Sequence, residues 1–164
     1  MTALRRLGGR LFEAGFGPGG IRTLAVIVAL SVVVVVSLVN QKNTNDLSSA
    51  VAQATALLGE AQSRSVTQTN NVSWGVHFSN ATNTAPFYAI FSSSYSPTTS
   101  IGYYRLPPDV AYATATLPVG TAIDVLFQQI SGLPVASATI GFVSLSQGSL
   151  TSTISVSSAG VVSN

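Results

Sequence analysis

Residues 23–39 read TLAVIVALSVVVVVSLV, and this stretch decides the expected architecture. It contains no charged residue, glycine or proline over its 17 residues. A helix of that length spans roughly 26 Å, slightly less than a ~30 Å hydrocarbon core, and Ile21 with the stem of Arg22 can extend it. In lipid the backbone must satisfy its own hydrogen bonds, which favours a helix despite the many valines. We therefore predict a membrane-anchoring helix whose apolar side chains include Leu24, Val26, Ile27, Leu30, Val34 and Leu38.

An apolar stripe follows this run, within residues 43–66. Its members recur at steps of four, three, four and three, which is the spacing of one helix face, and they are Leu47, Val51, Ala54, Leu58 and Ala61. No glycine or proline interrupts residues 21–58. We therefore predict one helix over 21–66, roughly 69 Å long. We call its second half the stalk, and we expect the stripe to pack against an apolar surface. Gln53 lies outside the stripe.

Basic residues are concentrated before the apolar run. Residues 1–22 contain four arginines and one glutamate, a net charge of +3. The positive-inside rule then places the N-terminus in the cytoplasm and residues 40–164 outside. A cleaved secretory signal peptide has the same order of basic and apolar segments and is the alternative. Against it, the apolar run exceeds the usual 7–15 residues, and Asn-Gln-Lys at 40–42 follows it instead of a clean Ala-x-Ala site.

From residue 70 onward the pattern changes to short alternating segments separated by turn residues. Strands are predicted at 74–78, 87–91, 101–106, 110–117, 123–127, 138–145 and 150–156. The expected fold class is α+β, with the long N-terminal helix packed on a C-terminal antiparallel β-sheet or β-sandwich. The expected organisation is a basic leader at 1–20, an anchor and stalk helix at 21–66, and a β-domain at 70–164.

The composition argues against several classes of function. Charged residues make up only 7% of the chain, against roughly 25% in an ordinary globular protein. Residues 23–164 have three basic and four acidic side chains, a net charge of −1, so the basic character belongs to the leader and no nucleic-acid partner is expected. The chain has no cysteine, which excludes disulfides and cysteine metal sites.

No catalytic, metal or cofactor site is predicted, and no small-molecule substrate is evident. His77 is the only histidine, so a multi-histidine metal site cannot form, and strand alternation points it away from the face of Trp74. Asp109 and Asp124 could be a carboxylate pair, but their turn and strand settings favour structural roles. The tyrosines at 95, 103 and 104 are interpreted mainly as sheet packing, with exposed contacts as the alternative. We therefore do not expect an enzyme.

Several short blocks carry a resemblance to a known family: AQSRS at 61–65, WGVHF at 74–78, YAIF at 88–91, LPPDV at 106–110 and TISVSSAGV at 153–161. With the order of basic leader, glycine, apolar helix, stalk and β-domain, the chain resembles type IV pilins and type II secretion pseudopilins, in particular the H-type minor pseudopilins. The resemblance implies a structural subunit in the inner membrane with a single pass and a periplasmic or extracellular C-terminal domain. The implied partners are other pilin or pseudopilin subunits and a prepilin peptidase.

The resemblance also implies a processing junction, between Gly20 and Ile21. The family site is a glycine followed by Phe-Thr-Leu-x-Glu. Here Thr23 and Leu24 fit, but Arg22 does not, and Ala25 replaces the glutamate. In the family that glutamate neutralises a neighbouring subunit's N-terminal ammonium, and an unpaired charge at that depth is costly.

The missing glutamate therefore implies a minor or tip subunit, or a diverged protein that is not processed. Gly15 followed by Phe16 is a second candidate junction, although Pro18 and the glycines after it would then interrupt the helix.

Two functions remain open at this level. In the first, the chain is a filament subunit whose apolar helix moves from the bilayer into a filament core, where heterologous contacts repeat without closing. In the second, it is a membrane-anchored, extracytoplasmic binding module that does not polymerise. Processing at Gly20 and association with filaments would distinguish the two.

Overall fold

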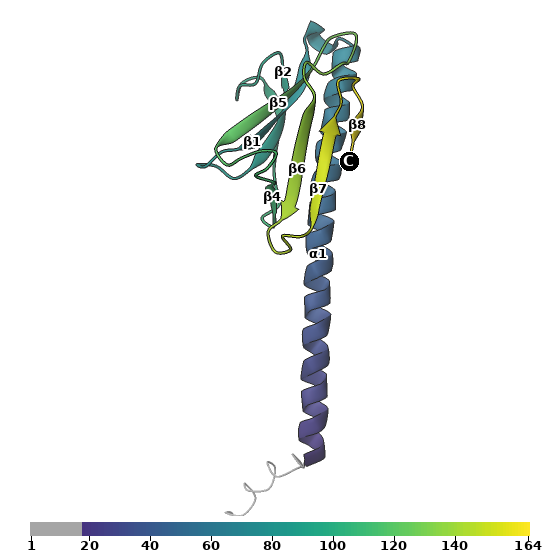
Figure 1. Ribbon diagram of the computed structural model, residues 1–164, viewed down its shortest axis with the longest axis vertical. Coiled ribbons are helices and arrows are strands. Elements are labelled where there is room, and N and C mark those ends of the chain that lie inside the picture. Colours follow the sequence, from purple (N-terminus) through teal and green to yellow (C-terminus); the bar gives the residue numbers. More distant parts are fainter. Residues whose placement is uncertain (1–17) are drawn as a thin grey trace, which may run out of the picture. The chain divides into compact units, whose positions relative to one another are not determined.

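A single long helix precedes a series of β-strands. The computed structural model describes the backbone of residues 18–164 and, with Ser37 and Val39, the side chains from Gln41 onward. Helix α1 covers Pro18–Val66, and the chain divides into two compact units, Met1–Asn40 and Gln41–Asn164. The second unit contains the C-terminal part of α1 and every strand described below (Figure 1).

The strands form two antiparallel sheets. In the first the order is β3-β2-β1-β5, and in the second it is β4-β6-β7-β8. The bounds are β1 Trp74–Asn80, β2 Phe87–Ser92, β3 Ser100–Arg105, β4 Val110–Tyr112, β5 Thr121–Phe127, β6 Ala138–Ser144, β7 Thr151–Val156 and β8 Val162–Ser163. A short 3-10 turn, Thr69–Asn71, joins α1 to β1. The predicted α+β class, with a helix followed by antiparallel sheets, is confirmed.

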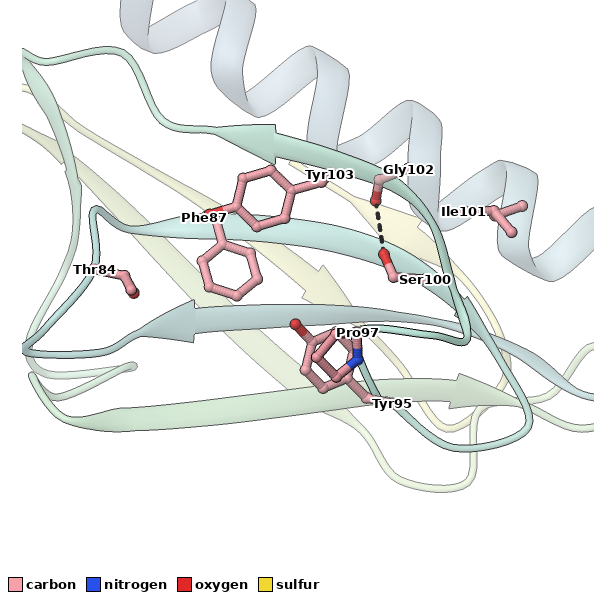
Figure 2. A pocket seen from close by; sticks show the side chains of 8 residues that line it. All are labelled: Thr84, Phe87, Tyr95, Pro97, Ser100, Ile101, Gly102 and Tyr103. Carbon is pink, nitrogen blue, oxygen red and sulfur yellow. Dashed lines mark hydrogen bonds between the residues drawn. The ribbon is translucent and has the colours of Figure 1, made fainter.

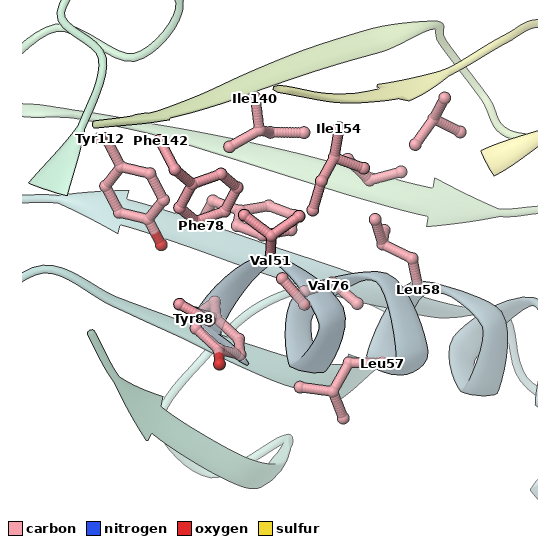
Figure 3. Packing of buried hydrophobic residues seen from close by; sticks show 14 of the residues in the cluster. Val51, Leu57, Leu58, Val76, Phe78, Tyr88, Tyr112, Ile140, Phe142 and Ile154 are labelled. Atoms are coloured by element: carbon pink, nitrogen blue, oxygen red, sulfur yellow. The ribbon is translucent and has the colours of Figure 1, made fainter. Parts of the chain in front are cut away.

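The apolar stripe of α1 lies inside the core. All five stripe residues are buried, each at 3% exposure or less, namely Leu47, Val51, Ala54, Leu58 and Ala61. Ala50 and Leu57 widen the stripe. One hydrophobic cluster joins these side chains to both sheets, including Val76, Phe78 and Tyr88 from the first and Tyr112, Ile140, Phe142 and Ile154 from the second (Figure 3). Burial of each Leu or Phe here contributes on the order of 2 kcal/mol, so one helix face holds the two sheets together.

Two strands differ from the sequence-based expectation. The strand expected at 110–117 ends at Tyr112, because the chain then turns: the backbone N–H groups of Thr116 and Leu117 both donate to the Ala113 carbonyl. The Thr116 hydroxyl then accepts a hydrogen bond from the backbone N–H of Gly141 in β6, at 2.8 Å. The two-residue strand β8 was not predicted, because so short a strand shows no alternation.

The N-terminal predictions lie mainly outside the described side chains. The predicted anchor at 23–39 and the junction between Gly20 and Ile21 fall within the backbone of α1, but the anchor side chains from Leu24 to Leu38 are not described. Within the residues that the structure describes fully, no helix is long and apolar enough to cross a membrane. The anchor and the junction remain predictions.

Candidate functional site

The outer face of the first sheet, turned away from the core, carries a row of aromatic and charged side chains. Strand alternation places Trp74, Val76 and Phe78 of β1 on the inner face and His77 on the outer one. Across the sheet, His77 pairs in register with Asp124 of β5 on one side and with Ala89 of β2 on the other. Tyr103 of β3 lies opposite Ala89 and continues the row.

His77 lies at the centre of this row. Its Nδ1 is 2.5 Å from Asp124 Oδ1, and the Tyr95 ring stacks on the imidazole with centroids 3.4 Å apart and planes 2° from parallel. Tyr95 belongs to the loop between β2 and β3, which folds back over the outer face. His77 is consequently only 7% exposed. The predicted direction, away from the face of Trp74, agrees with the register. The covering of the side chain was not predicted, since strand alternation cannot anticipate a covering loop.

A groove opens beside this row (Figure 2). Its volume is about 470 Å³, and it is lined by Thr84, Phe87, Tyr95, Pro97, Ser100, Ile101, Gly102 and Tyr103. The Phe87 and Tyr103 rings lie 4.5 Å apart and form one wall, while Ser100 Oγ donates to the Gly102 carbonyl at 3.4 Å. The lining is mainly aromatic and apolar, with hydroxyl groups as its polar side chains. Such a surface favours apolar contact over acid–base chemistry.

The three tyrosines considered in the sequence have different environments. Tyr104 is partly buried against the core and stacks on Tyr88 at 5.7 Å, so it is a packing residue. Tyr95 covers His77, whereas Tyr103 is 49% exposed at the groove. Burial, with a smaller contribution from Tyr104, raises the pKa of Tyr88 to about 12. Its hydroxyl therefore stays protonated at neutral pH, and it donates to Gln53 Oε1 of α1 at 2.6 Å.

A second polar cluster ties the helix to the second sheet. Asp109, in the turn before β4, accepts hydrogen bonds from the hydroxyls of Ser144 and Ser146 at 2.7 and 2.9 Å and from the backbone N–H of Ser146. These hydrogen bonds, of which the one from the Ser144 hydroxyl has the largest effect, lower the pKa of the Asp109 carboxyl below its ordinary value. Asn43 of α1 donates to Ser146 Oγ at 2.6 Å. This arrangement of short hydrogen bonds between elements serves to fix the fold.

The two carboxylates considered as a pair are not neighbours. Asp124 lies on β5 in the first sheet, beside His77, and Asp109 precedes β4 in the second sheet. Among the described residues, no group of three or more His, Asp or Glu side chains could hold a metal ion. The Tyr95 stack and the Asn43 contact were missed by sequence reasoning, because each joins segments that no local pattern connects.

Comparison with known proteins gives one fold-level likeness. No protein-family model matches the sequence, and no curated protein matches it significantly. Among solved structures, the chain is similar to the type IV minor pilin FimU of Pseudomonas aeruginosa strain PAO1, with a TM-score of 0.51 and 16% identity. The match covers 73% of this chain and 87% of the FimU chain. The chain therefore has a pilin-like fold, in which a long helix packs on antiparallel β-sheets.

Proposed function

We propose that this chain is a minor structural subunit of a type IV pilus or of the related type II secretion pseudopilus. The observation that carries the proposal is the likeness of its fold to a minor pilin over most of that protein's length. The sequence adds an uncharged run at residues 23–39 before the helix enters the folded unit, and a basic leader before that run.

The proposed mechanism is packing. In the inner membrane, residues 23–39 anchor the chain with the β-domain outside. A prepilin peptidase cuts between Gly20 and Ile21, which removes a leader containing three of the arginines. The apolar helix then leaves the bilayer for a filament core made of the same segment of neighbouring subunits. Those subunits are the partners, and repeated heterologous contacts extend the filament.

Two features bear on the finer assignment. The missing glutamate at position 25 supports a minor or tip subunit over a major one, because a tip subunit has no preceding N-terminus to neutralise. The short blocks at 61–65 and 106–110 support an H-type pseudopilin, while the structural likeness is to a minor pilin of a pilus. Both lead to the same architecture and the same assembly chemistry.

A membrane-anchored binding module is the second candidate. The aromatic groove beside Tyr103 favours it, since a cavity of this size with a mainly apolar lining and an exposed tyrosine ring is typical of ligand contact. In that case the chain would keep its leader or its membrane location and would not enter a filament.

Filament association tests the proposal. Filaments isolated from cells that make the wild-type chain, whether pili from the surface or pseudopili from the periplasm, should contain it. Gly20→Val, which places a branched side chain at the junction, should leave the chain full length and in the membrane fraction. Gly9→Val in the leader is the matched control and should behave as wild type. A wild-type chain confined to membranes, in cells whose filaments are otherwise intact, would support the binding module instead.

A further inference from the structure

Strand β3 has one side without a partner strand. It is a terminal strand of the first sheet, where it pairs with β2 alone. The N–H of Leu106, directly after β3, donates to the Pro86 carbonyl at 3.0 Å. Because bonded and non-bonded positions alternate along an antiparallel pair, Tyr104 also bonds β2, whereas Tyr103 and Arg105 direct their backbone N–H and C=O groups away from it. Among the described residues, no loop or side chain bonds these outward groups.

This unpaired side is short. The register with β2 passes from Gly102 directly to Ser100, so the Ile101 between them is an extra residue and β3 has a bulge there. At the other end Pro107, which has no N–H, closes the strand. We call the unpaired side of residues 102–105 the β3 edge. Bulges and prolines at an edge prevent pairing between whole sheets, so the β3 edge suits only a short added segment.

The groove described above lies along the same strand (Figure 2). Half of its lining comes from β3, including the exposed side chains of Ile101 and Tyr103. Where a peptide adds a strand to a sheet edge, backbone hydrogen bonds supply affinity and pockets for alternate side chains supply specificity. A residue placed opposite Tyr103 would have its side chain on the outer face, at the groove. Unpaired backbone groups and a side-chain pocket therefore occur together on β3.

Arg105 adds a positive charge to the β3 edge. Its side chain is exposed, with Cζ 5.9 Å from the centroid of the Tyr103 ring. Each described side-chain carboxylate has another partner, namely Asp46 with Lys42, Glu60 with Arg64, Asp109 with Ser144 and Asp124 with His77. Since β3 contains no acidic residue, the β3 of a second copy would bring none to Arg105. Opposite charges on facing positions of adjacent strands attract, so an acidic segment fits this edge better than a second copy does.

We propose that the β3 edge binds a short extended peptide segment of another protein, with a carboxylate opposite Arg105 and an uncharged apolar side chain opposite Tyr103. The segment runs antiparallel to β3, as do the strand pairs of both sheets. Its residue opposite Tyr103 exchanges two backbone hydrogen bonds with β3, and its apolar side chain lies at the groove. The β3 edge belongs to the unit Gln41–Asn164, so this binding is open to a filament subunit and to an anchored module alike.

A synthetic peptide tests the backbone pairing. The probe is dye-labelled Glu-Thr-Val-Thr-Val with blocked ends, which in the antiparallel register places its Glu opposite Arg105 and its first Val opposite Tyr103. Fluorescence anisotropy measures its binding to the full-length chain in lipid nanodiscs. N-methylation of the first Val removes the N–H that donates to the Tyr103 carbonyl and should weaken binding about tenfold.

N-methylation of the second Thr of the probe is the matched control. Its N–H points away from β3, so binding should weaken by less than about twofold. An apolar contact without strand pairing would respond equally to the two modifications, and this result would overturn the proposal. So would the absence of binding at about 1 mM probe.

The charge pair has a test of its own. Arg105→Gln in the chain and Gln in place of the probe's Glu should each weaken binding about threefold, and the two changes together should weaken it no more than either alone. Losses that multiply would show that the two charges do not meet, which contradicts the proposed register.

Amide hydrogen exchange locates the bound probe. At saturation, exchange at Tyr103 and Arg105 should slow about tenfold, because their outward N–H groups become bonded, while exchange at residues 121–124 of the opposite edge strand β5 should not change. Slowing at β5 alone would overturn the proposal. Slowing at Tyr103 and Arg105 without the probe, as the concentration of the chain is raised, would assign the β3 edge to a second copy instead.

Discussion

At the scale of single residues, two glycines show how local space decides the effect of one added methyl group. Gly75 lies in β1, where a Cβ would approach Val125 O to 2.6 Å and Phe91 Cζ to 2.9 Å. Gly59 lies on α1, where a Cβ would meet nothing within 4 Å. The same substitution should therefore have opposite effects at the two positions.

We predict that Gly75→Ala lowers the free energy of unfolding of the 41–164 fragment by about 2 kcal/mol, because backbone and ring must shift to admit the methyl group. Gly59→Ala should raise it by about 0.5–1 kcal/mol, because alanine loses less chain entropy in a helix. Urea unfolding of both variants measures the two values. A stabilised Gly75→Ala variant would contradict the described packing of β1 against β5.

The Asp109 cluster predicts a pH effect with a definite sign. The pKa of Asp109 is lowered in the folded chain, so its contribution to stability is fully present above the ordinary carboxyl pKa and is lost as the pH falls through the lowered value. The stability advantage of the wild type over Asp109→Asn should therefore be constant down to about pH 5 and shrink towards about pH 3. Urea midpoints for both chains across this range measure it, and an advantage that grows on acidification would show that the sign is wrong.

At the scale of elements, periodicity was informative wherever one face of an element is buried. The stripe spacing in α1 and the alternation in β1 and β5 correspond to burial against the common core. In β2 alternation was not informative, because Tyr88 and Ile90 belong to the core cluster while Phe87, Ala89 and Phe91 are buried outside it. Periodicity could not show that the strands divide into two sheets, because pairings such as β1 with β5 and β4 with β6 join distant segments. For the same reason the covering of His77 by Tyr95 was not predictable.

The helix face gives the main prediction at this scale. Leu58→Asp should lower the free energy of unfolding of the 41–164 fragment by at least about 4 kcal/mol, because it removes a fully buried side chain and buries an unpaired charge. Gln53 lies outside the stripe but is a poor control, because its side chain accepts a hydrogen bond from the Tyr88 hydroxyl that a substitution would remove. Ala52 is exposed, and Ala52→Asp should cost about 1 kcal/mol or less. Similar losses in the two variants would show that α1 does not supply the core.

At the scale of the whole molecule, a predicted membrane anchor precedes a pilin-like folded unit in the sequence. The likeness to FimU shows the fold. In the proposed filament, the apolar run at residues 23–39 would supply the contacts between neighbouring subunits. The orientation that we propose, with the N-terminus in the cytoplasm, rests on the arginines before the run. A topology reporter fused after Asn164 should therefore be active outside the cytoplasm, whereas cytoplasmic activity would remove the basis for both candidate functions.

The mass of the mature N-terminus tests the central claim most directly, because maturation distinguishes a filament subunit from a protein that is merely anchored. Gly20 has no side chain and permits close approach of a protease to the backbone, and cutting there frees the apolar helix from a leader that would hold it at the cytoplasmic face. Mass spectrometry of the wild-type chain purified from membranes should find a protein that begins at Ile21. A chain that retains Met1, or one that begins near Asn40 and so lacks the anchor, would contradict the account.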